Sequence, residues 1–211
     1  MGYESPMPVQ EEVIPFLLGD DNDVIALAQT GTGKTAAFGL PILQKIDVTT
    51  YHPQALVLCP TRELCLQIAD DLNDYSKYID NLKVLPVYGG SSIESQIKTL
   101  KRGVHVVVAT PGRLLDLMNR KTVDLSLVKN VIMDEADEML NMGFTDSINA
   151  ILAEVPENRN MLLFSATMPK EIANITKKYM KNPKEIVIGN KNEGNKNIRD
   201  IYYICLLYTS P

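Results

Sequence analysis

Short apolar runs alternate with helical patterns along most of the chain, and this alternation constrains the fold more than any other feature. Most of the runs are apolar throughout, which is typical of strands covered on both faces. Strand followed by helix, repeated this often, predicts an α/β fold with a doubly wound, mostly parallel sheet and helices on both faces. The predicted strands are Val24–Ala28, Ala55–Cys59, Lys83–Tyr88, His105–Ala109, Asn130–Met133, Met161–Phe164 and Glu185–Ile188. The predicted helices are 8–19, 33–46, 62–77, 92–101, 111–119, 144–154 and 169–180.

The length of 211 residues suits one sizeable domain. We expect that domain to span residues 1–188. Residues 189–197 contain no apolar side chain and read as a linker, and 198–211 read as the start of a truncated second domain. No apolar run approaches the roughly 20 residues of a membrane span. The three cysteines lack metal or disulfide spacing, which suits a reducing, cytoplasmic location.

The net charge of -5 argues against binding nucleic acid by bulk charge. Charge is unevenly spread, because residues 170–199 carry eight bases and three acids. The simplest interpretation of that basic stretch is a solvated helix followed by a lysine-rich linker.

A glycine-rich segment follows the first predicted strand and opens a helix. Its glycines let backbone N–H groups approach phosphate oxygens, and the helix start presents a positive dipole end to the same anion. Lys34 would reach the β- and γ-phosphates and Thr35 would bind Mg²⁺. The alternative is a strand–helix turn without a ligand. The segment comprises Ala28, Gln29, Thr30, Gly31, Thr32, Gly33, Lys34 and Thr35.

An acidic tetrad begins directly after the buried-type run 131–133. Because ligand sites of open α/β sheets lie at the carboxyl ends of strands, Asp134 would sit near the phosphate loop as a Mg²⁺ partner. Glu135 could act as general base on the attacking water. A solvated acidic turn is the alternative, and the nearby phosphate loop argues against it. Ser165 and Thr167 follow another strand, and their hydroxyls could bind a carboxylate of the tetrad or cap a helix.

Three further groups also follow predicted strands. They place backbone N–H groups, hydroxyls and two arginines at one edge of the sheet, where such groups can position a phosphate backbone without reading bases. Thr110 with Pro111 is equally a good helix start. The residues concerned are Thr61, Arg62, Gly90, Thr110 and Arg113.

Together these motifs resemble the DEAD-box ATP-dependent RNA helicases over residues 2–204. The motifs stand in the family's order: Gln10, AQTGTGKT, PTREL, GG, TPGR, DEAD and SAT. The resemblance implies a RecA-like P-loop NTPase domain, ATP and Mg²⁺ as cofactors, and RNA as partner. It also implies that the second RecA-like domain, with its arginine fingers, is missing in cis.

The resemblance also implies roles by position. Gln10 would read the adenine edge, with Tyr3 as a stacking neighbour. Asp137, Ser165 and Thr167 would couple hydrolysis to strand separation, while the arginine-bearing edge would contact the RNA backbone. Met7 stands where the family usually has Thr. Two alternatives stay open: an RNA-binding module without catalysis, and a DNA-directed helicase.

Overall fold

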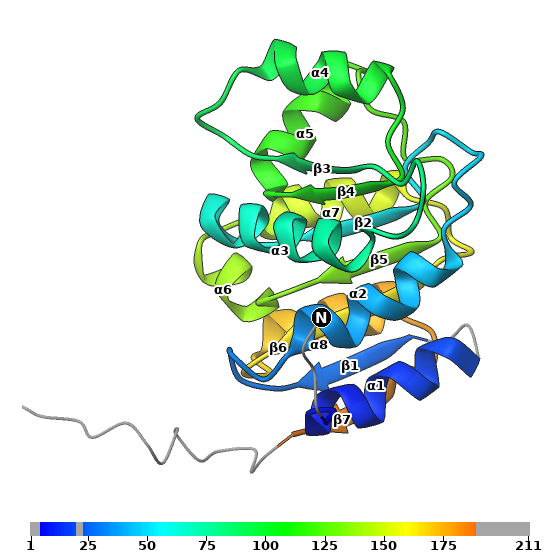
Figure 1. Cartoon of the computed structure of the whole chain (residues 1–211). Coiled ribbons are helices and arrows are strands. Elements are labelled where there is room, and N and C mark those ends of the chain that lie inside the picture. The colour runs from blue at the N-terminus through cyan, green and yellow to red at the C-terminus, as the bar shows by residue number, and fades with distance from the viewer. Residues whose placement is uncertain (1–4, 20–22, 189–211) are drawn as a thin grey trace, which may run out of the picture.

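The computed structural model describes residues 5–19 and 23–188. Its centre is one seven-stranded sheet with the order β3-β4-β2-β5-β6-β1-β7, in which the strand pairings are parallel (Figure 1). This confirms the predicted α/β fold. The strands are β1 Val24–Leu27, β2 Ala55–Leu58, β3 Val84–Val87, β4 Val106–Ala109, β5 Asn130–Met133, β6 Asn160–Ser165 and β7 Lys184–Val187.

Helices cover both faces of the sheet, as the doubly wound prediction requires. The first three helices pack on one face and the remaining five on the other (Figure 1). The first set is α1 Pro8–Gly19, α2 Lys34–Lys45 and α3 Arg62–Tyr75. The second set is α4 Ile93–Lys101, α5 Pro111–Asn119, α6 Ala136–Asn141, α7 Thr145–Glu154 and α8 Lys170–Tyr179.

The two-residue period of the strands divides the core into two layers. In β1, Val24 and Ala26 face α1–α3, whereas Ile25 and Leu27 face the opposite helices. The rings of Phe38 and Phe164 pack with centroids 5.4 Å apart and both are fully buried. Burial of a side chain of this size stabilises the fold by roughly 1.5–3 kcal/mol.

The structure corrects the predicted elements in two places that affect the site. The short helix α6 was not predicted, and it begins inside the acidic tetrad at Ala136. Ser165 is the last residue of β6 rather than a residue beyond the strand. Other element ends shift by one or two residues. Tyr3, the predicted linker 189–197 and the predicted second-domain start 198–211 lie outside the described residues.

The sheet order separates the motifs into two groups. β5, β6 and β1 are neighbours, so the acidic tetrad, the Ser165–Thr167 segment and the phosphate loop meet at one end of the sheet. β2, β4 and β3 are likewise neighbours and carry the arginine-bearing loops. Among the described helices, none is both long and apolar enough to cross a membrane.

Candidate nucleotide site and nucleic-acid edge

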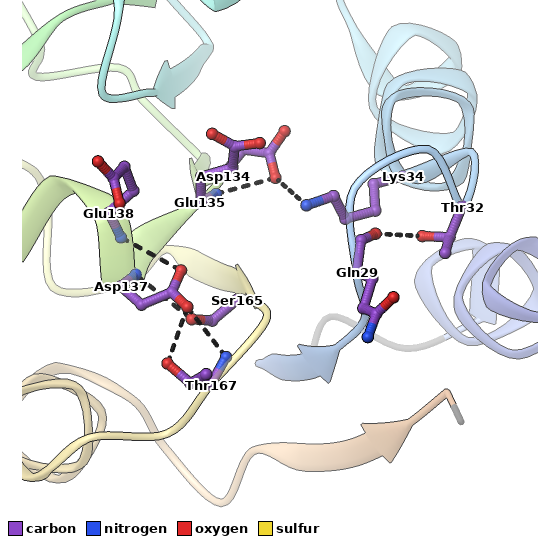
Figure 2. Close-up of polar contacts among 9 residues, drawn as sticks. All are labelled: Gln29, Thr32, Lys34, Asp134, Glu135, Asp137, Glu138, Ser165 and Thr167. Carbon is purple, nitrogen blue, oxygen red and sulfur yellow. Dashed lines mark hydrogen bonds and ion pairs between the residues drawn. The ribbon is translucent and has the colours of Figure 1, made fainter. Parts of the chain in front are cut away.

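The phosphate loop turns sharply between β1 and α2. Gly31 and Gly33 have φ angles of 76° and 80°, a conformation that side chains other than glycine rarely adopt. The Thr32 hydroxyl donates a hydrogen bond of 2.8 Å to the Gln29 carbonyl and closes the loop on itself (Figure 2). The loop leads directly into the N-terminus of α2, and the positive dipole end of this helix would stabilise a bound anion.

Gln10 of α1 joins the start of its own helix to this loop. Its Oε1 accepts from the Met7 backbone N–H at 3.0 Å, and its Nε2 donates to the Gly33 carbonyl at 3.2 Å. Gln10 is buried, and a Cβ placed on Gly33 would lie 2.5 Å from Gln10 Nε2. A side chain on Gly33 would therefore strain the backbone at its positive φ and would displace the Gln10 amide.

Lys34 extends from α2 to the acidic tetrad. Its Nζ lies 3.1 Å from Asp134 Oδ1, and both side chains are buried (Figure 2). Asp134 Oδ1 also accepts from the Glu135 backbone N–H at 3.0 Å. Separating a buried ion pair costs several kcal/mol unless each charge finds another partner. Nucleotide phosphates would supply one for Lys34.

Glu135 stands at the turn between β5 and α6 with a φ of 50°, which is unusual for a residue with a side chain. Burial raises the pKa of its carboxyl, and the neighbouring Asp134 raises it further, while Lys34 opposes the effect. A carboxyl that binds its proton more tightly is a stronger base, which suits proton abstraction from water.

Asp137 connects α6 to the end of β6 (Figure 2). Its Oδ2 accepts from both the Thr167 hydroxyl, at 2.8 Å, and the Thr167 backbone N–H, at 3.0 Å. The Ser165 hydroxyl accepts from the Asp137 backbone N–H at 3.3 Å. The Thr167 hydroxyl therefore binds a carboxylate of the tetrad, whereas the Ser165 hydroxyl accepts from a backbone N–H in the first turn of α6. Helix α8 begins at Lys170 after the N-cap residue Pro169, without a side-chain capping hydrogen bond.

The oxygen donors near the loop fit Mg²⁺. Thr35 offers a hydroxyl and Asp134 a carboxylate, and Mg²⁺ prefers such hard oxygens together with waters and substrate phosphates. Within residues 5–19 and 23–188, no three His, Cys, Asp or Glu side chains form a metal-binding group. Asp71 of α3 was not predicted: it hydrogen-bonds the Thr35 hydroxyl, and burial raises its pKa.

The arginine-bearing loops meet at the other half of the sheet. The Arg62 guanidinium lies 5.0 Å from the centre of the Tyr88 ring, and a Cβ on Gly90 would lie 3.6 Å from Arg62 Nη1. Arg113 Nη1 and Nη2 donate to the Ser91 carbonyl at 3.2 and 3.3 Å. Both guanidinium groups are therefore held beside the turn that follows β3.

Gln96 of α4 organises this turn and was not predicted. Its Nε2 donates to the Tyr88 carbonyl at 3.2 Å and to the Ser91 hydroxyl at 2.7 Å. Its Oε1 accepts from Arg113 Nη1 at 3.1 Å, and the residue is buried. A glutamine on an amphipathic helix has no distinguishing sequence pattern, so only the contacts reveal its position.

The two threonines of this edge differ. The Thr61 hydroxyl caps α3 by accepting from the Leu64 backbone N–H at 3.2 Å. Thr110 is the N-cap of α5 with Pro111 at the first position, but its side chain makes no capping hydrogen bond. The predicted helix start at Thr110 is therefore confirmed, and its hydroxyl is not used in capping.

Comparison with known proteins agrees with this geometry. The model of the DEAD/DEAH box helicase family matches residues 7–175. The protein named ATP-dependent RNA helicase DeaD in Mycobacterium tuberculosis (strain CDC 1551 / Oshkosh) is 52% identical over 202 residues, covering 96% of this chain and 36% of that protein. Its namesake in Escherichia coli (strain K12) is 47% identical, covering 96% of this chain and 32% of that protein.

Two solved structures share the fold. A DEAD box protein from the hyperthermophile Methanococcus jannaschii matches with a TM-score of 0.84 and 46% identity, covering 88% of this chain and 50% of that one. A hypothetical ATP-dependent RNA helicase from Sulfolobus tokodaii matches with a TM-score of 0.81 and 44% identity, covering 89% and 54%. The chain spans about a third of the length of the curated relatives it matches. It belongs to the DEAD/DEAH box helicase family.

Proposed function

We propose that residues 1–188 form the ATP-binding RecA-like domain of an RNA helicase. The observation that carries this proposal is the buried pair of Lys34 and Asp134, because it joins the phosphate loop to the acidic tetrad. Two motifs far apart in sequence thereby form one site for a nucleotide. Lys34 would exchange its carboxylate partner for the β- and γ-phosphates when ATP binds.

The residues around this pair suit hydrolysis. Mg²⁺, held by Thr35, Asp134 and the phosphates, would neutralise negative charge on the transferred group. Glu135 would take a proton from the attacking water, and its raised pKa favours that step. Gln10 would present its amide to the adenine edge. The hydrogen bond to Gly33 keeps this amide close to the loop.

The second half of the sheet edge would hold RNA. Arg62 and Arg113, together with Thr61, Gly90 and Thr110, would contact the sugar–phosphate backbone without reading bases. Asp137, with its two bonds to Thr167, would couple the nucleotide state to the RNA strand. A second RecA-like domain, beginning after a linker at 189–197, would complete both sites, and we place the protein in the cytoplasm.

Nucleotide binding by the chain tests the proposal. We expect Lys34→Ala to weaken Mg²⁺–ATP binding about 10- to 100-fold, the loss of one charge-assisted hydrogen bond. Lys177 is an exposed lysine of α8, and Lys177→Ala serves as the control that should leave the affinity for Mg²⁺–ATP unchanged. Isothermal titration calorimetry measures both, with an unfolding curve for each variant. Equal affinities of folded Lys34→Ala and wild type would contradict the assigned site.

Base selection has its own test. Gln10→Glu keeps an oxygen for the Met7 N–H but removes the amide donor, so α1 retains its start while adenine recognition is lost. We expect the preference for ATP over GTP to fall about tenfold, the loss of roughly one hydrogen bond. An unchanged preference would exclude Gln10 from base recognition while leaving the phosphate site intact.

A further inference from the structure

A buried glutamine lies behind the arginine-bearing edge. Gln96 of α4 is only 6% exposed, although its amide carries both N–H donors and an acceptor oxygen. A buried amide destabilises the fold unless these groups find partners. The partners of Gln96 therefore show what the residue does at this position.

The turn after β3 fixes which end of this amide faces which neighbour. The Nε2 group donates to the Tyr88 carbonyl at 3.2 Å and to the Ser91 hydroxyl at 2.7 Å. Because a carbonyl oxygen can only accept, the amide nitrogen must lie on this side, where both of its hydrogens are used. The amide oxygen must then face the other way, and Arg113 Nη1 donates to it at 3.1 Å.

These contacts occupy one side of the Arg113 guanidinium. Nη1 donates to Gln96 Oε1 and to the Ser91 carbonyl, and Nη2 donates one hydrogen to the same carbonyl. A guanidinium carries N–H donors on all three nitrogens, so the Nε hydrogen and the second Nη2 hydrogen remain. In the part of the chain that the structure describes, neither of these hydrogens is bonded to a protein acceptor.

The two remaining donors form a fork that fits a phosphate. The Nε hydrogen and the outer Nη2 hydrogen lie parallel on one edge of the planar group, and such an edge binds two oxygens of one phosphate at once. Arg113 is half-buried, whereas Arg62 is exposed and packs over the Tyr88 ring. Hydrogen bonds to the turn and to Gln96 therefore fix the direction in which Arg113 presents its fork.

We propose that Gln96 is a positioning residue for RNA binding, which turns the Nε–Nη2 edge of Arg113 toward one phosphate of the strand. The amide does not contact RNA itself and acts through the guanidinium that it holds. This inference rests on the proposed contact of Arg113 with RNA, and it adds which atoms make that contact and what orients them.

Removal of the amide tests the positioning role. Gln96→Met keeps an unbranched side chain and removes the acceptor, while the Tyr88 carbonyl keeps the Ser91 hydroxyl as a donor at 3.4 Å. By fluorescence anisotropy, we expect the whole protein with this change to bind single-stranded RNA about five- to tenfold more weakly, part of one charge-assisted hydrogen bond. In an Arg113→Ala background the same change should weaken binding no further.

Gln44 of α2 is an exposed glutamine, and Gln44→Met serves as the matched control that should leave RNA affinity unchanged. An unfolding curve for each variant confirms that it is folded. Equal losses from Gln96→Met in the wild-type and Arg113→Ala backgrounds would overturn the proposal, because they would show that Gln96 supports the turn rather than Arg113.

The fork has its own test. Arg113→Lys keeps the charge but offers no pair of parallel donors, so RNA affinity should fall nearly as far as in Arg113→Ala. The slope of log affinity against log salt should become shallower by about 0.7 in Arg113→Ala, the loss of one phosphate contact with a single strand. An Arg113→Lys protein that binds RNA like wild type would overturn the fork.

The orientation of the guanidinium can be measured without RNA. Because Gln96 and Ser91 hold one side of the group, its rotation about the Nε–Cζ bond should be slow. We expect nitrogen NMR of the free protein to resolve the two Nη signals of Arg113 in wild type and to show them merged in Gln96→Met. Merged signals in wild type would overturn the positioning role. Resolved signals in a wild type that binds no RNA would count against the proposed function and leave the positioning of Arg113 standing.

Discussion

Gly33 is constrained both by its positive φ and by close contacts, whereas Gly31 shares only the positive φ. Both have φ near 80°, but a Cβ on Gly31 meets nothing within 4 Å, whereas one on Gly33 meets Gln10 and Met7. Alanine variants at the two glycines therefore distinguish the cost of the positive φ, which both share, from the cost of the contact with Gln10, which only Gly33 has. Gly33 accepts a hydrogen bond from Gln10, so its substitution should disturb the base recognition proposed for Gln10 as well as the turn.

We accordingly expect Gly31→Ala to lower the free energy of unfolding by about 1 kcal/mol, and Gly33→Ala by about 2 kcal/mol or more. Only Gly33→Ala should displace Gln10 and reduce the preference for ATP over GTP. Urea unfolding and nucleotide titration measure the two effects. Equal losses in both variants would show that the contact with Gln10 has no energetic consequence.

Glu135 is held in an environment that disfavours its charge. Because its pKa is raised in the folded state, its favourable contribution to stability is present below its ordinary value of 4.5 and is lost as pH rises through the raised value. Glu135→Gln should therefore raise Tm by about 1 to 3 °C at pH 7. The gain should vanish near pH 4. Calorimetry at both pH values measures it, and a lower Tm at pH 7 would contradict this electrostatic account.

At the scale of the element, helix α1 has an incomplete start. The Met7 carbonyl accepts from the Glu11 N–H, and Gln10 reaches back to the Met7 N–H, so half of a capping box is present. Met7 has no side-chain oxygen for the other half. Met7→Thr should stabilise the protein by about 1 kcal/mol, and Met7→Leu should not. Chemical denaturation compares them, and equal stability of the two variants would exclude the missing cap.

The elements also show where sequence reasoning works. Continuous apolar runs such as Val106–Ala109 predicted buried parallel strands, because strands covered on both faces need no polar side. Helix α6 escaped prediction because its six residues carry too little periodicity. The burial of Gln96 and the contact of Asp71 with Thr35 depend on packing between elements that the sequence does not order.

At the scale of the whole molecule, one sheet carries both proposed sites. The order β5-β6-β1 gathers the residues proposed to bind the nucleotide, and β3-β4-β2 gathers the arginines. The sequence predicted that each motif follows a strand, but not which strands are neighbours. Asp137 and Thr167 join α6 to the segment that follows β6, and the proposed coupling would require movement of one element to shift the other.

A change in the Asp137–Thr167 bond can therefore test the proposed coupling of ATP hydrolysis to strand separation without removing a residue proposed to act in hydrolysis. Thr167→Val removes the hydroxyl donor to Asp137 and keeps the side-chain shape. We expect the whole protein with this change to retain ATP turnover within about threefold and to lose roughly tenfold or more in duplex unwinding. Parallel ATPase and strand-displacement assays measure both. Equal losses in the two assays would show that this bond supports the fold rather than coupling.

We propose that the whole protein containing this domain hydrolyses ATP in response to RNA, and the ATPase rate of the whole protein tests this most directly. We expect single-stranded RNA to stimulate turnover, DNA of the same sequence to stimulate it far less because it lacks the 2′-hydroxyl, and Glu135→Gln to reduce the RNA-stimulated rate about 10²-fold or more. Equal stimulation by DNA, or unchanged turnover in Glu135→Gln, would contradict the account.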